Sequence, residues 1–175
     1  MIKGLLLGVL ATVGFGAVLA YAAIVTGSIP ANADANPSPA EKWAARTSLH
    51  ATLAREAASL SNPLAATDSN LISGIKLYAA NCAVCHGTAD AQPSRIARGL
   101  YQHPPQFAKD GVEDDPAGKI AWQIDHGIRL TGMPAFGHNL DDQQRWQITL
   151  FLVHMDKLPP SVEKAWKSVR QPQPR

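Results

Sequence analysis

Hydrophobic residues are distributed along this chain in two different ways. From Gly4 to Ala33 no side chain is charged, and the most apolar part, Leu5 to Ile29, exceeds the roughly 20 residues that cross a bilayer as a helix. After Asp34 the apolar residues recur at helical spacing, and no run alternates with a period of two. The pattern predicts an N-terminal transmembrane helix followed by an all-α part made of several short helices with long loops.

The N-terminal apolar segment has a second interpretation, a cleaved signal peptide that uses Ala31-Asn32-Ala33 as its cleavage site. Such a signal has an apolar region of only about 7–15 residues, so the greater length favours an uncleaved anchor. Lys3 precedes the span and favours an N-terminus in the cytoplasm with the remainder outside. We therefore assign residues 1–29 to a transmembrane anchor, with the signal peptide as the alternative.

Turn-forming and capping residues divide the rest of the chain. Residues 30–39 are rich in Ala, Asn, Pro and Ser, which is typical of a solvated linker. Ser38-Pro39-Ala40-Glu41 then provides an N-cap and a proline at the first helical position, so an accessory helix is expected from there towards Leu60. Residues 30–67 are assigned to this linker and helix.

Three further helices are predicted downstream. The first begins near Thr67 or Asp68 and ends near Asn81, the second lies between Asp115-Pro116 and Gly127, and the third opens at an Asp141/Gln144 capping box. Their apolar positions are Leu71, Ile75, Tyr78 and Cys82; Ile120 and Ile124; and Trp146, Leu150, Phe151 and Val153. The loops between them are long for a compact domain, which a large apolar cofactor would explain.

Charge and cysteine content exclude two classes of protein. The formal net charge is +2, and neither Lys nor Arg forms a run that could neutralise a row of phosphates, so we expect no binding to nucleic acid. The chain has 2 cysteines, Cys82 and Cys85, so no disulfide framework braces the fold. This pair needs its own explanation.

Cys82-Ala83-Val84-Cys85-His86 is a C-x-x-C-H sequence, the attachment motif of c-type haem. Two thiols three positions apart reach the two vinyl groups on one edge of a porphyrin, and the next residue turns its imidazole onto the iron. A structural zinc site would need further ligands, and a thioredoxin-like dithiol would need neighbouring strands. A chance C-x-x-C-H is the remaining alternative.

A second axial ligand is expected from Met133. This residue lies in Thr131-Gly132-Met133-Pro134, a loop that its glycine and proline keep out of a helix, and methionine is a soft sulfur ligand that raises the reduction potential of haem iron. A core methionine is the plainer interpretation of the same residue. The competing sixth ligands are His103, His126 and His138, although a position at a helix end before Gly127 already explains His126.

Together these residues resemble the class I cytochrome c family over roughly residues 70–157. The resemblance rests on Gly74 and Tyr78, on the Cys82–Gly87 segment, on the Gly127–Pro134 loop and on the aromatic last helix. It implies a small cytochrome c haem domain at residues 68–158, followed by a C-terminal tail at 159–175, with Gly74 where the first and last helices cross. It also implies a proline carbonyl against the proximal histidine, for which Pro104 and Pro105 are candidates.

The resemblance further implies electron transfer without catalysis, by one covalently bound haem c with His86 and Met133 as iron ligands. An enzyme or gas sensor with an open axial position is the alternative. The expected partners are redox proteins, such as membrane-bound dehydrogenase or oxidase complexes, together with the membrane itself, and no small-molecule substrate is expected. The expected location is the bacterial cytoplasmic (inner) membrane, single-pass, with the haem domain in the periplasm.

Overall fold

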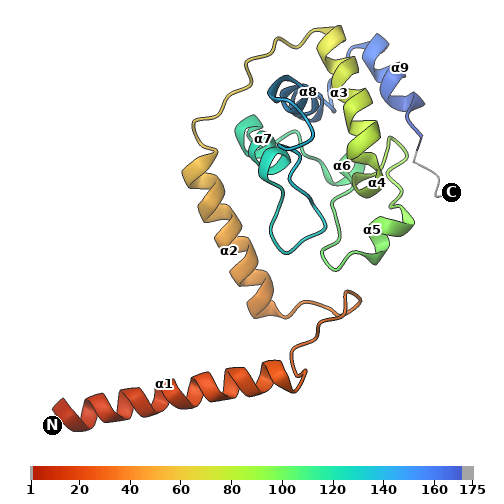
Figure 1. Cartoon of the computed structure of the whole chain (residues 1–175). Helices are drawn as coiled ribbons and strands as arrows, with labels where there is room; N and C mark the ends of the chain where they lie inside the picture. Colours follow the sequence, from red (N-terminus) through yellow and green to blue (C-terminus); the bar gives the residue numbers. More distant parts are fainter. Residues whose placement is uncertain (1, 171–175) are drawn as a thin grey trace. The chain divides into compact units, whose positions relative to one another are not determined.

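The computed structural model describes residues 2–170 and separates the chain into two compact units at the junction of Ala35 and Asn36. Every regular element within the described residues is a helix, in the order that Figure 1 shows. The prediction of an all-α chain with an apolar N-terminal helix is confirmed.

The first unit contains α1, Ile2–Val25. At 1.5 Å per residue this helix is about 36 Å long, which is enough to cross a bilayer. It is the one helix among residues 2–170 that is long and apolar enough to do so, and its most apolar stretch is not buried. A membrane anchor and a signal sequence both meet these criteria.

The second unit opens with α2, Pro39–Glu56. As expected, Ser38 is the N-cap and its hydroxyl accepts a hydrogen bond from the Glu41 amide at 3.2 Å. The helix ends four residues before the predicted Leu60. Leu53 near its end is buried, whereas residues 39–48 are exposed, and Glu41 in the first turn accepts a hydrogen bond from the Tyr101 hydroxyl at 2.6 Å. A Cβ atom added at Gly118 would lie 2.5 Å from the Leu60 carbonyl oxygen, so the segment after α2 sits directly against the start of α7, Ala117–His126.

The core is built on the packing of α3, Asp68–Asn81, against α8, Asp142–Val153. Thr67 caps α3, and Asp141 and Gln144 form the predicted capping box at the start of α8. A Cβ atom at Gly74 would overlap the Gln147 carbonyl oxygen, so the two backbones touch where the resemblance led us to expect their crossing. Figure 1 shows the two helices together in the second unit.

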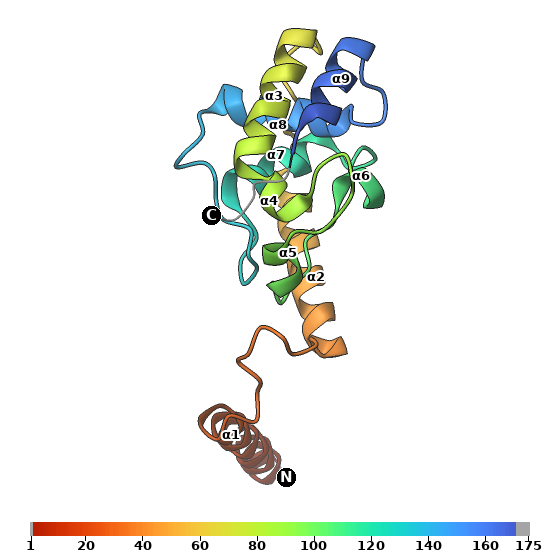
Figure 2. The same cartoon turned by 90° about the vertical axis from the view of Figure 1, so that its right-hand side faces the viewer.

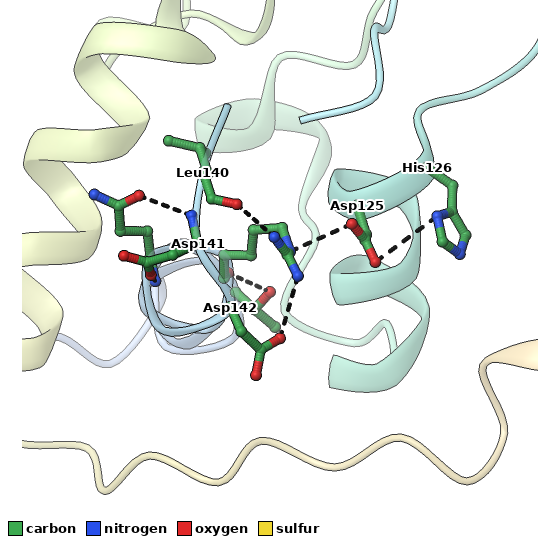
Figure 3. Close-up of polar contacts among 8 residues, drawn as sticks. Asp125, His126, Leu140, Asp141 and Asp142 are labelled. Carbon is green, nitrogen blue, oxygen red and sulfur yellow. Dashed lines mark hydrogen bonds and ion pairs between the residues drawn. The ribbon is translucent and has the colours of Figure 1, made fainter. Parts of the chain in front are cut away.

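Charged groups join α7 to α8 at one edge of this core. Arg145 Nε lies 3.4 Å from Asp125 Oδ1, and the same guanidinium lies 3.3 Å from Asp142 Oδ1 and donates to the Leu140 carbonyl. Figure 3 shows this set, with His126 pointing towards Asp125. The side chains of Arg145 and Asp125 are 16% and 35% exposed, so this pair is screened less than the one with the exposed Asp142.

Three short helices follow α3: α4, Ala83–His86; α5, Arg95–Gly99; and α6, Phe107–Asp110. α4 and α6 each end before a glycine, Gly87 and Gly111, and α5 begins after the cap residue Ser94. Ser94 caps α5 and its hydroxyl also donates to the Val84 carbonyl, which attaches α5 to α4. Helices this short give no periodic signal in the sequence.

The segment after Pro159, which we expected to be a C-terminal tail, forms part of the same core. Residues Pro160–Ser168 are α9, and Val162 and Trp166 on this helix are 0% and 5% exposed. The Trp166 ring meets Tyr78 edge-on at 5.5 Å, and Figures 1 and 2 both show α9 beside α3. Residues 171–175 of the expected tail lie outside the described residues.

Candidate functional site

An apolar cavity of about 390 Å³ lies in the second unit. Its volume is in the range of about 300–1,000 Å³ that is typical of ligand pockets. The four site residues predicted from the sequence all line it: Cys82, Cys85, His86 and Met133. Ile120, Ile124, Ile148 and Leu152 supply apolar wall from α7 and α8. The cysteine motif and Met133, about fifty positions apart in sequence, therefore line the same cavity.

The two cysteines and the histidine come from one turn of chain. α3 ends at Asn81, Cys82 caps it, and the His86 amide donates to the Cys82 carbonyl at 2.9 Å. The chain then leaves through Gly87, whose φ of 78° is in the left-handed region that favours glycine. The Tyr78 hydroxyl donates to the Gly87 carbonyl at 2.9 Å, so a fully buried core side chain fixes the exit from the motif.

The His86 ring is held on two sides. Its Nδ1 is 3.0 Å from the Pro105 carbonyl oxygen, and its ring stacks on Phe107 with centroids 4.2 Å apart and planes 5° apart. Of the two candidate prolines, Pro105 therefore provides the carbonyl. Burial lowers the pKa of His86, against the raising effect of the hydrogen bond to Pro105, so the neutral imidazole is favoured. Neutral imidazole is the form that binds a metal ion.

Gln106 supports this arrangement and was not identified from the sequence. Its Nε2 donates to the Cys85 carbonyl at 2.9 Å and to the Pro104 carbonyl at 3.1 Å. One amide thus joins the cysteine motif to the loop that holds His86. Its Oε1 is the one buried side-chain oxygen or nitrogen of the described chain without a hydrogen bond. No local sequence pattern marks Gln106, because its partner in the cysteine motif, Cys85, lies 21 residues earlier in the chain.

The two thiols are not in the setting of a reactive dithiol. Burial, with a smaller effect of Cys85, raises the pKa of Cys82 to about 12, and burial also raises the pKa of Cys85. Thiol oxidoreductases instead lower a cysteine pKa with nearby positive charge or a helix N-terminus. Together with the absence of strands from residues 2–170, this argues against the thioredoxin-like alternative.

The loop that carries Met133 is closed by its own backbone. The Ile128 amide donates to the Met133 carbonyl at 3.2 Å, and Thr131 Oγ1 accepts from the Met133 amide at 3.1 Å. A Cβ atom at Gly127, where φ is 65°, would lie 2.7 Å from the Met133 carbonyl oxygen, so this glycine permits the closure. Leu130 at the tip also has a positive φ, 61°, although the left-handed region costs a non-glycine residue about 1–2 kcal/mol.

The three histidines considered as alternative ligands lie in different places. His103 is exposed and lines the cavity. The His126 ring meets Trp122 edge-on at 4.5 Å and lines a separate cavity of about 420 Å³ between α2, α7 and α8. His138 is exposed and is not among the residues that line either described cavity.

The residues present fit a haem. The Nε2 atom of His86 makes no hydrogen bond to the described part of the chain, while Nδ1 is engaged by Pro105, so the ring is oriented with one nitrogen available. The cavity supplies two thiols, an imidazole and a thioether within an otherwise apolar lining. Thioether-forming cysteines together with nitrogen and sulfur ligands are the donor set of a c-type haem.

Comparison with known proteins agrees with this donor set. Residues 69–152 match the model of the family described as cytochrome C oxidase, cbb3-type, subunit III. The match begins within α3 and ends within α8, so it includes the whole cysteine motif and the Met133 loop but neither α2 nor α9. No curated protein sequence matches the chain.

Proposed function

We propose, from the premise that this chain belongs to the c-type cytochromes through its domain at residues 69–152, that it is a single-haem electron carrier. In this proposal Cys82 and Cys85 each form a thioether bond, and His86 Nε2 and Met133 Sδ are the two axial ligands. The observation that carries the proposal is the shared cavity, since these four residues line it together while Pro105 leaves His86 Nε2 available.

Bound haem supplies a one-electron change of iron oxidation state. The chain's own residues determine what else is possible at the site. With His86 and Met133 as its ligands, the iron of a bound haem would have no position for a substrate, and the apolar side chains of α7 and α8 would give the haem an apolar surrounding. The Pro105 carbonyl and the Phe107 ring keep the imidazole in one orientation, so little rearrangement accompanies a change of charge.

We further propose that α1 remains in the bacterial inner membrane and that the second unit faces the periplasm. Lys3 ahead of the span supports this orientation. Attachment of haem to cysteine outside the cytoplasm agrees with it. The partners are then redox proteins of the same membrane, and the matched family is named for an oxidase subunit, which supports an oxidase complex among them.

The attachment is tested with the haem itself. Holoprotein should keep its haem through denaturing electrophoresis and acid-acetone extraction, and its pyridine haemochrome spectrum should be of the c type. Cys82→Ala with Cys85→Ala should release the haem under the same treatment. Extraction of haem from the wild-type protein would contradict the proposal.

The axial ligands are tested with Met133→Ala. The wild-type ferric protein should show the weak sulfur-to-iron charge-transfer band, and the variant should lose the band, bind carbon monoxide in the ferrous state and have a lower reduction potential. His103→Ala and His138→Ala are the matched controls and should keep the band. Ready binding of carbon monoxide by the wild-type protein would instead support an enzyme or gas sensor, and loss of low-spin character in His103→Ala would indicate a bis-histidine haem.

A further inference from the structure

Arg145 joins the two ends of the chain segment that carries Met133. This segment, residues 127–141, connects the end of α7 to the start of α8, and Arg145 lies near the start of α8. The Arg145 guanidinium lies 3.4 Å from Asp125 Oδ1 in the last turn of α7, and it donates to the Leu140 carbonyl at the other end of the segment. Figure 3 shows dashed lines from this group to both Asp125 and Leu140. One planar group with several N–H donors thus holds both ends of the Met133 segment.

Asp125 is itself fixed to the half of the segment that follows Met133. The Phe136 amide donates to the Ile124 carbonyl at 3.0 Å, and the Gly137 amide donates to the Asp125 carbonyl at 3.0 Å. A Cβ atom added at Gly137 would overlap Asp125 Oδ1, so the carboxylate lies directly against the backbone of the Met133 segment. A shift of the Asp125 side chain would therefore move the chain four residues from Met133.

The Asp125 carboxylate depends on the positive charge of Arg145. It lies in the last turn of α7, where the carbonyls of the helix end carry a partial negative charge that disfavours a carboxylate. Within residues 2–170 its ion pairs are those with Arg145 and with the neighbouring His126 ring, whose Nδ1 is 3.7 Å from Asp125 Oδ2. Arg145 is the permanently charged member of the two. Without it, Asp125 would be repelled by the helix end and by Asp142, the second carboxylate that Arg145 contacts.

Arg145 does not line the cavity that it would support. Met133 lines the cavity of about 390 Å³, whereas Arg145 and Asp125 line the separate cavity of about 420 Å³. The hydrogen bonds of Ile128 and Thr131 close the tip of the Met133 segment on itself and do not reach α8. Among the polar contacts described for residues 2–170, the ion pair of Arg145 with Asp125 is the one that joins α7 to α8.

We propose that Arg145 is a positioning residue for Met133: by holding Asp125 and the Leu140 carbonyl together, it fixes both ends of the Met133 segment and so keeps the thioether at the iron. This inference rests on the proposed function, in which Met133 is an axial ligand. A ligand on a loop keeps its place only if the loop is held, because the conformational entropy of a free loop favours its release.

The test measures how readily Met133 is displaced. Full-length, detergent-solubilised ferric holoprotein is titrated with imidazole, which binds the iron only where the thioether leaves, and loss of the sulfur-to-iron charge-transfer band reports the displacement. Arg145→Gln removes the charge but keeps a polar side chain. Arg55→Gln is the matched control, because Arg55 also forms an ion pair, at 2.7 Å to Glu56, and neither of its described contacts is with the Met133 segment.

We expect Arg145→Gln to bind imidazole roughly tenfold more tightly than the wild type, as for the loss of one hydrogen bond between charged groups. Amide hydrogen exchange over residues 127–141 should become faster in the same variant. Arg145→Lys restores the charge beside Asp125 but not the fork of donors, so its imidazole affinity should lie between the two. Asp125→Asn added to Arg145→Gln should reverse part of the effect, because it removes the unpaired carboxylate. Arg55→Gln should match the wild type.

Wild-type imidazole affinity in Arg145→Gln would overturn the proposal. Faster hydrogen exchange throughout the second unit, with no excess over residues 127–141, would also overturn it, because Arg145 would then act on stability in general. If Arg145→Gln does not fold, Arg145→Lys takes its place, and an imidazole affinity equal to that of the wild type would be the contradicting result. A wild-type protein with attached haem but without the charge-transfer band would instead contradict the proposed function itself, and this inference with it.

Discussion

At the scale of single residues, the site depends on groups of two kinds. Residues that would bind the cofactor, such as Cys82 and His86, carry a motif that is recognisable in sequence. Residues that hold them in place carry none. Gln106 and Phe107 act on His86 and Cys85 only because α6 and the preceding loop fold back onto the cysteine motif. Sequence reasoning therefore identifies the residues that would bind the cofactor and, through the family resemblance, Pro105 as a candidate support of His86, but it misses Gln106 and Phe107.

Gln106 provides a prediction at this scale. Gln106→Met preserves the shape of the side chain but leaves the Cys85 and Pro104 carbonyls without their donor. Buried carbonyls that lose a partner cost about 1–3 kcal/mol, so the free energy of unfolding should fall by about that amount. Chemical denaturation of the holoprotein, followed by the haem absorbance, measures it.

The same variant should shift the reduction potential, because the loop that presents Pro105 to His86 is less firmly held. Gln102→Met is a suitable control, since Gln102 lines the same cavity and donates to neither carbonyl. A Gln106 variant with wild-type stability and potential would show that the two hydrogen bonds are unimportant for the site.

For the helices, the success of prediction from sequence depended on whether capping residues mark the helix start. The starts of α2, α3 and α8 were predicted correctly because caps are local chemistry. The crossing of α3 and α8 at Gly74 was expected from the family resemblance. α9 was assigned to a tail. Val162 and Trp166 are buried, and Ala165 and Val169 pack against the same core. These four positions have the spacing of one helical face, so the sequence did contain a signal for this helix that the assignment to a tail missed.

Gly74 provides the prediction for the helix crossing. In Gly74→Ala the new methyl group overlaps the Gln147 carbonyl and lies 3.0 Å from Phe151 Cβ, so α3 and α8 must separate. Overpacking of this kind costs about 1–3 kcal/mol, which exceeds the gain of up to about 1 kcal/mol in helix propensity.

Thermal or chemical denaturation should therefore show a less stable holoprotein. Gly99→Ala is the control, because a Cβ atom at the last residue of α5 meets nothing within 4 Å. Equal stability of the Gly74 variant and the wild type would mean that the helices do not approach as closely as described.

At the scale of the whole molecule, the chain is two units of different chemistry. α1 is apolar from Gly4 onward except for Thr12, whereas the second unit buries its apolar residues around the cavity and the α3–α8 contact. Hydropathy alone predicted the apolar N-terminal helix, because length and absence of charge identify such a segment without any tertiary information. The same pattern leaves open whether α1 is retained or cleaved.

The membrane prediction distinguishes the two. If α1 is a retained anchor, the holoprotein should stay in the membrane fraction after a carbonate wash and require detergent for release. Replacement of residues 1–33 by a cleavable signal should give a soluble holoprotein with the same visible spectrum. A native protein that begins at Asp34 and is soluble without detergent would establish the signal peptide instead.

The segment between α1 and α2, residues 26–38, has a consequence for the rate of electron exchange. Fully extended it spans about 45 Å. If α1 remains in the bilayer as proposed, the second unit can search only a thin layer above the membrane, and a short linker would then give an effective concentration on the order of millimolar for a partner in reach. Each docking event can then be weak and brief, which allows rapid turnover, because confinement rather than affinity returns the carrier to its partner.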